Sequence, residues 1–326
     1  MVIQQEALKS TLNRYNGALP ALWVIVGSEP LLALEAGDLL REAARKAGYT
    51  ERVVFEYAAS SDWSGLLEAM SSVSLFDDKK IVELRFLSSG PGIKGAKVLQ
   101  EFTRLAPDSD SVLSIVHLTQ VDYKTKQSAW FKHLTQKAQV INCDPITRER
   151  YPQWLQARLK EQGQSIQADA LEFLSEQTEG NLLAAQQEMM KLSLLYPEQN
   201  LSLSQVSDSV MNVSRYSIDD LLEAIAHSDI PRVCRTLTGI EAEDEPLPLI
   251  LMRLSSFIRD IITVHSGGRV FGRNHAMMTA RRISQNKAAN ALARCADLDR
   301  LAKGLTMRSR DDVWMELKAL CLFLAR

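Results

Sequence analysis

The chain has 326 residues, of which 46% are hydrophobic and 24% charged, and its formal net charge is −2. This length predicts two or three domains, and the composition is typical of a globular protein. The small net charge does not indicate a nucleic-acid partner, and no run of about 18 apolar residues predicts a membrane span.

Strand-like and helix-like segments alternate over the first 143 residues. Residues 21–26 form a continuous apolar run of the kind found in buried parallel strands. The elements predicted after it are a helix from about residue 31, a strand over 52–55, a helix over 63–70, a half-buried strand over 81–86, a helix over 96–105, a strand over 112–118, a helix over 128–136 and a strand over 139–141. This alternation predicts an α/β domain over residues 1–143, with a parallel sheet covered by helices on both faces.

The strand pattern stops after Asp144-Pro145, and the rest of the chain is predicted to be helical. Short helices are expected over 151–159, 168–177, 182–195 and 204–211. They predict a small helical domain over residues 144–211. Residues 212–326 form a second helical region, with breaks at 243–246 and 267–268 and a strongly apolar face over 247–264. The predicted fold class is therefore α/β followed by all-α, in three domains.

A parallel sheet followed by a small helical domain is typical of the AAA+ nucleoside-triphosphatases, so the first strand should lead into a phosphate-binding loop. Such a loop ends in Gly-Lys-Ser/Thr, whose amides and lysine hold phosphates. Here Gly27-Ser28-Glu29-Pro30 is too short, has no lysine and places a negative charge where phosphate would lie. The strand over 112–118 ends without the Asp-Glu pair that holds magnesium. Leu183 stands where such proteins have an arginine directed at the nucleotide.

These three departures predict an AAA+-like architecture without an ATPase site. We therefore expect no catalytic residues and no cofactor. The alternative is an active AAA+-type ATPase with an unusual phosphate loop.

The cysteines and histidines predict no metal site. The four cysteines, Cys143, Cys234, Cys295 and Cys321, lie far apart without a CxxC pair, and the histidines lack the spacing of metal ligands. Buried thiols in a reducing cytosol account for this pattern. Residues 1–6 also lack the basic and then apolar order of a secretory signal, so we expect a cytoplasmic protein with no membrane partner.

A large apolar pair, Leu75-Phe76, lies between the predicted helix over 63–70 and the predicted strand over 81–86. Its neighbours, including Ser74 and Asp77, are polar. Apolar side chains are buried by default, so the pair either folds inward or is presented to a partner. The residues alone leave both interpretations open.

A basic run crosses the last helical region. Between Arg253 and Arg310 there are 12 lysines and arginines against 3 aspartates and glutamates. A run of this kind is either a solvated helix face or a contact with DNA phosphates or with acidic surfaces of other subunits. A stand-alone DNA-binding scaffold is a further alternative that uses it. The centre of the run is Arg269, Arg273, Arg281, Arg282, Lys287 and Arg294.

Five segments, taken in order, resemble the delta subunit of the bacterial DNA polymerase III clamp loader. The features run from residue 20 to the last predicted helix, so the resemblance covers nearly the whole chain. The segments are Trp23-Val24-Ile25-Val26-Gly27-Ser28-Glu29-Pro30-Leu31-Leu32, Val73-Ser74-Leu75-Phe76, Ala129-Trp130-Phe131, Glu179-Gly180-Asn181-Leu182-Leu183-Ala184 and Val313-Trp314-x-Glu316-Leu317.

The resemblance implies a degenerate AAA+ domain over 1–143, a helical lid over 144–211 and an oligomerising helical collar over 212–326. It implies a non-catalytic subunit of the polymerase (nucleotidyltransferase) holoenzyme, placed in a five-membered ring with gamma/tau motor subunits and delta-prime. Such a subunit binds the beta sliding clamp and opens its ring for loading on primed DNA.

The same resemblance assigns clamp binding to Val73, Ser74, Leu75 and Phe76. Related clamp-binding peptides often carry a glutamine upstream of the leucine. Here Ser71 and Ser72 occupy that stretch.

Overall fold

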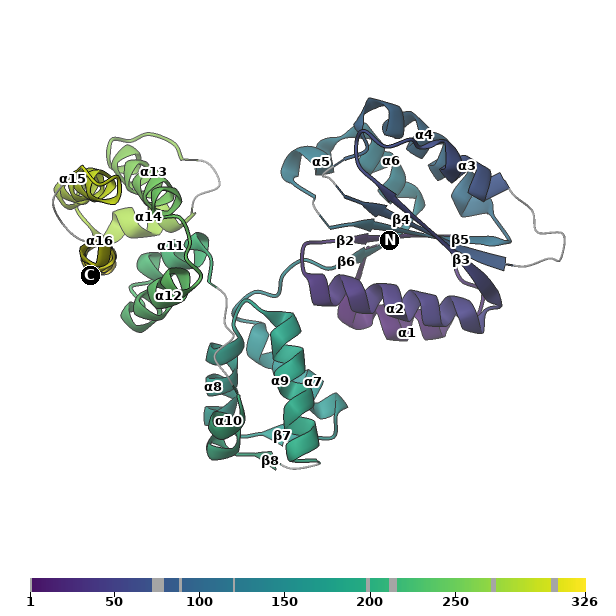
Figure 1. Ribbon diagram of the computed structural model, residues 1–326, viewed down its shortest axis with the longest axis horizontal. Coiled ribbons are helices and arrows are strands. Elements are labelled where there is room, and N and C mark those ends of the chain that lie inside the picture. The colour runs from purple at the N-terminus through teal and green to yellow at the C-terminus, as the bar shows by residue number, and fades with distance from the viewer. Residues whose placement is uncertain are drawn as a thin grey trace. The chain divides into compact units, whose positions relative to one another are not determined.

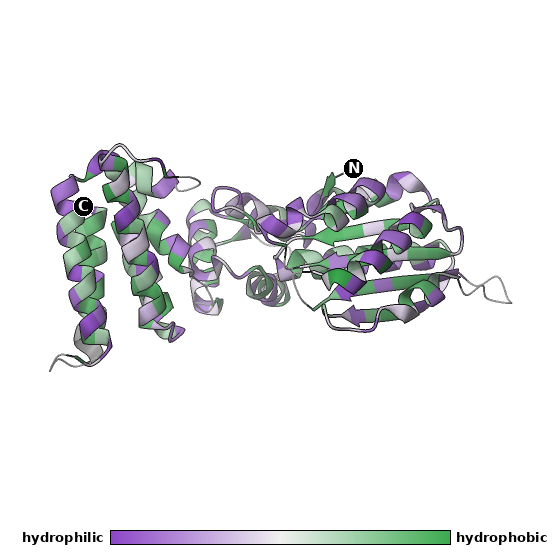
Figure 2. Ribbon diagram, turned by 90° about the horizontal axis from the view of Figure 1, so that it is seen from above, coloured by the Kyte–Doolittle hydropathy of each residue, from purple (hydrophilic) through white to green (hydrophobic). Residues whose placement is uncertain are grey.

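The computed structural model describes residues 2–71, 79–87, 90–119, 121–197, 200–210, 216–270, 274–305 and 310–326. The chain forms two compact units, Met1–Tyr151 and Pro152–Arg326, which we call the first and second unit. In Figure 2 the strands of the sheet are largely hydrophobic, whereas the helices carry both hydrophobic and hydrophilic residues. This contrast is expected for a sheet that helices cover.

The first unit is built on a six-stranded sheet in which every pairing is parallel, with the strand order β1-β6-β2-β5-β4-β3. The strands are Val2–Gln4 (β1), Leu22–Val26 (β2), Tyr49–Tyr57 (β3), Lys79–Phe86 (β4), Val112–Leu118 (β5) and Gln139–Asn142 (β6). All five residues of β2 are buried at the centre of the sheet. The predicted parallel sheet is confirmed.

Helices lie on both faces of this sheet (Figure 1). They are Leu8–Tyr15 (α1), Pro30–Lys46 (α2), Ser64–Ser71 (α3), Gly92–Leu105 (α4), Tyr123–Gln127 (α5) and Ala129–Lys137 (α6), with short 3-10 turns at Gln5–Ala7 and Ala106–Asp108. The helices α1 and α2 cover one face, and α3, α4 and α6 cover the other. The second face holds a core in which Val24, Val82 and Val116 of the sheet pack with Leu66 of α3 and Phe102 of α4.

The second unit is helical. Its helices are Tyr151–Glu161 (α7), Ala168–Thr178 (α8), Leu182–Leu195 (α9), Leu203–Ser209 (α10), Ile218–Ala226 (α11), Ile230–Ala242 (α12), Leu247–His265 (α13), Asn274–Arg282 (α14), Gln285–Ala302 (α15) and Arg310–Ala325 (α16). The six helices from α11 through α16 share one hydrophobic core. In the part of the chain that is described, no helix has the length and apolarity needed to cross a bilayer. The predicted order, α/β followed by all-α, is confirmed.

Three details differ from the sequence predictions. The strand β1 and the helix α1, which lie before the first predicted strand, were not predicted. The absence of strands after Asp144-Pro145 is wrong, because Ser165–Ile166 (β7) pairs in parallel with Asn200–Leu201 (β8). Strands of two or three residues are too short to show a period in the sequence. The third difference concerns β4, which is buried around Glu83 on both faces instead of on one.

A buried arginine ties two groups of helices together inside the second unit. The side chain of Arg232, on α12, is only 2% exposed, and its guanidinium lies 2.8 Å from a carboxylate oxygen of Glu179, at the end of α8. The same guanidinium lies 3.1 Å from Glu223 and 3.5 Å from Asp220, both on α11. Glu179 is the first residue of the segment 179–184 in the predicted lid. Through Arg232, this residue connects the end of α8 to α11 and α12.

We predict that Arg232→Met destabilises the second unit by about 3 kcal/mol, because it leaves three neighbouring carboxylates without their shared cation. Arg300→Met is the matched control, since Arg300 forms an exposed ion pair with Asp297 and such pairs contribute about 0–1 kcal/mol. Urea denaturation followed by circular dichroism measures the difference. Equal stability of the two variants would contradict the role given to Arg232.

Candidate functional site

The predicted clamp-binding residues Val73, Ser74, Leu75 and Phe76 lie outside the described residues. The structure describes the two elements that lead into and out of this segment, α3 (Ser64–Ser71) and β4 (Lys79–Phe86). The way these two elements are held fixes the residues that flank this segment in the sequence.

The helix α3 is held at both ends. At its start, a carboxylate oxygen of Asp62 accepts a hydrogen bond from the N–H of Ser64 at 3.0 Å, which is a capping contact. Trp63 and Leu66 are buried in the core under the helix. Near its end, the hydroxyl of Ser114 on β5 donates to the sulfur of Met70 at 3.8 Å. The entry to the segment is therefore fixed on the sheet.

The turn after β2, where a phosphate-binding loop would lie, is closed by the chain itself. Gly27 has a φ of 140°, a conformation that favours glycine. A Cβ atom at Gly27 would overlap the backbone carbonyl of Cys143. The N–H of Glu29 donates to that carbonyl at 3.0 Å, and the N–H of Cys143 donates to the carbonyl of Val26 at 2.6 Å. The turn thus packs against the end of β6.

Glu29 occupies the N-terminus of α2. Its carboxylate is the cap of the helix and accepts a hydrogen bond from the N–H of Leu31 at 3.3 Å. Burial raises the pKa of Glu29, which the hydrogen bond from Leu31 partly offsets. The side chain takes the place at the helix end that favours an anion, so a phosphate there would meet a competing group.

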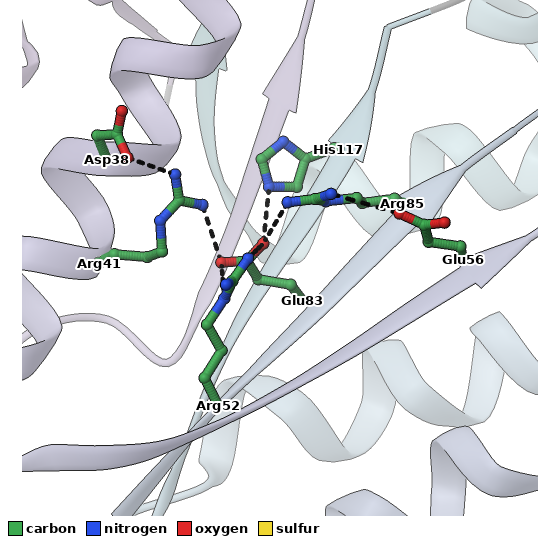
Figure 3. A network of polar contacts seen from close by, with 7 residues as sticks. All are labelled: Asp38, Arg41, Arg52, Glu56, Glu83, Arg85 and His117. Atoms are coloured by element: carbon green, nitrogen blue, oxygen red, sulfur yellow. Dashed lines mark hydrogen bonds and ion pairs between the residues drawn. The ribbon is translucent and has the colours of Figure 1, made fainter.

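A polar network lies on the face of the sheet next to α2 (Figure 3). At its centre is Glu83 of β4, whose side chain has no exposed surface. One oxygen accepts hydrogen bonds from Arg41 of α2 at 2.9 Å and from Arg52 of β3 at 2.8 Å. The other accepts from Arg52 at 2.9 Å and from Arg85 at 3.3 Å. Three guanidiniums from three elements therefore satisfy one buried carboxylate.

The outer part of the network is more exposed. Arg41 also donates to Asp38 at 2.6 Å, and Arg85 donates to Glu56 at 3.3 Å. His117, near the end of β5, places its Nε2 atom 3.8 Å from a carboxylate oxygen of Glu83.

In the network, the pKa values of Glu83 and His117 are both lowered. Burial alone would raise the pKa of Glu83, but the hydrogen bonds donated by Arg52 and Arg41 outweigh burial and lower it to about 2. Burial lowers the pKa of His117 to about 4, with an opposing contribution from Glu83. Near neutral pH, Glu83 is therefore charged and His117 is neutral.

The sequence did not point to this network. Val82, Leu84 and Phe86 alternate with Glu83 and Arg85, which predicts that the charged residues of β4 face solvent. The signal that could have been used is that charged residues on β3, Arg52 and Glu56, accompany the charged residues on β4, Glu83 and Arg85. Such a pattern predicts cross-strand ion pairs on one face.

The structure gives the basic residues of the second unit different surroundings. Arg273 lies outside the described residues, whereas Arg269 and Arg281 are exposed. Arg282 donates to the backbone carbonyls of Ile225 at 2.9 Å and Leu324 at 2.8 Å, near the C-terminal ends of α11 and α16. Its guanidinium therefore connects three helices of the core.

Lys287 and Arg294 share one aromatic ring. The Nζ atom of Lys287 lies 5.0 Å, and the Cζ atom of Arg294 5.4 Å, from the centroid of the Phe323 ring on α16. Contacts of this kind are cation–π interactions. The six basic residues singled out in the sequence are therefore not one continuous surface: among the described ones, Arg269 and Arg281 are the two whose side chains are exposed.

Comparisons with known proteins agree with the resemblance seen in the sequence. Residues 23–144 match the family described as DNA polymerase III, delta subunit. The chain is 26% identical to DNA polymerase III subunit delta of Escherichia coli strain K12 over 333 residues, covering 98% of this chain and 95% of that protein. It is 29% identical to the Haemophilus influenzae protein of that name over 238 residues, covering 72% and 68% of the two chains. The resemblance is thereby confirmed.

A solved structure shows the same fold. The Bacillus subtilis DNA clamp loader delta protein superimposes with a TM-score of 0.54 at 15% identity, covering 99% of this chain and 100% of that one. At this identity the likeness concerns the fold alone.

We predict that acid destabilises the first unit through both His117 and Glu83. Each pKa is lower in the folded protein than its ordinary value, 6.5 for His117 and 4.5 for Glu83. The unfolded chain therefore binds these protons first. The stabilisation from His117 is lost as the pH falls from 6.5 to about 4, and that from Glu83 from 4.5 to about 2.

The variants His117→Gln and Glu83→Gln test this by urea denaturation at several pH values. His117→Gln should flatten the upper part of the pH dependence, and Glu83→Gln the lower part. Glu83→Gln should also cost about 3 kcal/mol near neutral pH, because three guanidiniums lose the buried charge that they share. Glu42→Gln, at an exposed pair with Lys46, is the control. An unchanged pH profile for His117→Gln would contradict the buried neutral imidazole.

Proposed function

We propose that this chain, which is similar to DNA polymerase III delta subunits over nearly its whole length, is the delta subunit of a bacterial clamp loader. The carrying observation is the match to the Escherichia coli delta subunit, which covers 98% of this chain and 95% of that protein. The fold of a clamp loader delta protein over 99% of the chain agrees with it. The subunit would act in the cytoplasm, in a ring with gamma/tau motor subunits and delta-prime.

Within that complex, we assign to the chain the binding and opening of the beta sliding clamp. Leu75 and Phe76 are the proposed anchors, with Val73 and Ser74 beside them. Burying each large apolar side chain in a pocket of the partner contributes about 1.5–3 kcal/mol, and such anchors dominate interfaces. A subunit that binds the open clamp more tightly than the closed clamp shifts the ring toward opening. No bond-making chemistry is needed for this step.

The turn after β2 supports a role without ATP hydrolysis. Glu29 caps α2 and the turn packs on Cys143, so the geometry favours a subunit that depends on its partners for ATP. An ATPase with an unusual phosphate loop remains the competing function, and ATP binding by the isolated chain would favour it.

The three-domain division follows the same proposal. The α/β domain over 1–143 would carry the clamp-binding segment, residues 144–211 the lid and residues 212–326 the collar that joins the ring. The lid motif 179–184 contributes Glu179 to the buried Arg232 cluster. This contact favours a lid that is fixed to the collar instead of one that senses a nucleotide.

We predict that the double variant Leu75→Ala/Phe76→Ala weakens clamp binding by about a thousandfold, because two anchors of roughly 2 kcal/mol each are lost. Calorimetry with the purified clamp of the same organism measures the affinity. Leu194→Ala/Leu195→Ala is the matched control, since these two residues are exposed apolar neighbours on α9. Circular dichroism verifies that both variants are folded.

Unchanged clamp affinity of the Leu75/Phe76 variant would show that the segment is not the anchor. An unfolded variant would show instead that the pair belongs to the core. No binding of the wild-type chain to the clamp, on sizing of the mixture, would overturn the proposed function itself.

A contact between the collar and primed DNA is a second prediction, and the exposure of Arg269 and Arg281 favours it. Arg269→Ala/Arg281→Ala should weaken the affinity of the assembled clamp loader for primed DNA and lower the salt slope by about 2. Lys318→Ala, at an exposed position on α16, is the control. Arg282 is kept, since its loss would disturb the core. An unchanged salt slope would identify the run as a solvated face.

A further inference from the structure

We infer that Trp63 and Gly95 are positioning residues for the clamp-binding segment, because their contact sets how α3 lies on the sheet. This inference rests on the proposed function. Trp63 immediately precedes α3, and α3 leads directly into residues 72–78. Gly95 lies on α4, the neighbouring helix on the same face of the sheet.

The close approach of the Trp63 ring leaves no room for a side chain at Gly95. It lies inside the helix α4 and is buried, and it is not among the glycines with positive φ. Glycine inside a helix costs about 0.5–1 kcal/mol relative to alanine, so a close approach must offset this cost. A Cβ atom at Gly95 would lie 2.5 and 2.7 Å from two ring carbons of Trp63. The indole therefore packs directly on the backbone of α4.

The indole is also held on its other sides by aromatic rings. Its centroid lies 4.3 Å from that of Tyr57 on β3 and 5.7 Å from that of Phe86 on β4. Phe86 in turn stacks on Trp130 of α6 at 5.8 Å. Trp63 thus sits between two strands and α4 and is 3% exposed. Its neighbours leave the ring little freedom to shift.

Shape, more than hydrogen bonding, fixes this ring. Among the described residues, the Nε1 atom of Trp63 is buried without a hydrogen-bond partner. A buried donor without an acceptor costs about 1–3 kcal/mol. Because no hydrogen bond ties the indole to one orientation, the bare backbone at Gly95 and the flanking rings decide it.

The position of Trp63 is transmitted along α3. A helix rises 1.5 Å per residue, so the end of this short helix lies roughly 12 Å from its start. A tilt of about 10° at Trp63 would move that end by roughly 2 Å. Leu66 in the core and the contact of Met70 with Ser114 hold the rest of the helix, so the seat of Trp63 sets the direction from which α3 starts. The proposed clamp-binding segment follows this helix end directly in the sequence.

The test compares Gly95→Ala, Trp63→Phe and the double variant Gly95→Ala/Trp63→Phe in the full chain. We expect Gly95→Ala to weaken clamp binding about tenfold, because the added methyl group displaces the indole. The smaller ring of Trp63→Phe should leave room for that methyl group. The double variant should therefore bind the clamp about as tightly as Trp63→Phe alone.

Gly239→Ala in the second unit is the matched control. Gly239 also lies inside a helix, α12, and a Cβ atom there would lie 2.5 Å from a ring carbon of Tyr216. Gly239→Ala should therefore lower stability as Gly95→Ala does while leaving clamp affinity unchanged. This separates positioning from a general loss of stability, which thermal denaturation of each variant reports.

Amide hydrogen exchange on the free chain gives a second measurement that does not need the clamp. Gly95→Ala should speed exchange in α3, and Trp63→Phe should reverse the effect in the double variant.

If Gly95→Ala binds the clamp as tightly as the wild type, the inference is overturned and the proposed function is not. The same holds if the double variant binds tenfold more weakly than Trp63→Phe alone. Absence of wild-type binding would overturn the proposed function and the inference with it.

Discussion

One buried carboxylate organises the charged face of the sheet. Glu83 accepts hydrogen bonds from guanidiniums that come from α2, β3 and β4 itself. An unpaired buried carboxylate costs several kcal/mol, so pairing with these arginines stabilises the folded sheet. The interaction links the edge strand β3 to the interior through two side chains, Arg52 and Arg85. Because β4 begins directly after residues 72–78, the same carboxylate holds the strand into which the proposed clamp-binding segment leads.

The two ends of that segment are therefore held by different forces. Its entry, α3, rests on packing between Trp63 and the bare backbone at Gly95, whereas its exit, β4, rests on charge and on backbone pairing with both neighbouring strands. Packing contacts are not directional, so they depend on shape. Charge-assisted hydrogen bonds are directional and depend on geometry. Holding the two flanking elements in place lowers the ordering cost of the docking proposed for this segment.

The sequence predicted the strands and helices that are long enough to show a repeating hydrophobic pattern. It did not predict contacts between residues far apart in the chain. The alternation of strands and helices gave the parallel sheet, and the departures at Gly27-Ser28-Glu29-Pro30 indicated an altered phosphate loop. Pro30 at the start of α2 is a helix-start signal, but the capping of that helix by Glu29 was not predicted. The packing of Gly27 on Cys143 joins residues more than a hundred positions apart, and no local pattern contains it. The burial of Glu83 was missed for the same reason, since it depends on Arg41 arriving from α2.

The basic run of the second unit shows how tertiary contacts divide a uniform pattern into separate roles. In the sequence, Arg281 and Arg282 are adjacent and equivalent. In the fold, Arg281 is exposed, whereas the guanidinium of Arg282 reaches the carbonyls of Ile225 and Leu324. The last carbonyls of a helix have no partners within it and carry the negative end of its dipole, so a cation there stabilises α11 and α16 together. Both hydrogen bonds come from one nitrogen of the guanidinium, whose two N–H groups reach one carbonyl each. The charge that a local pattern assigns to a ligand surface is in this case part of what holds the helices of the proposed collar in one core.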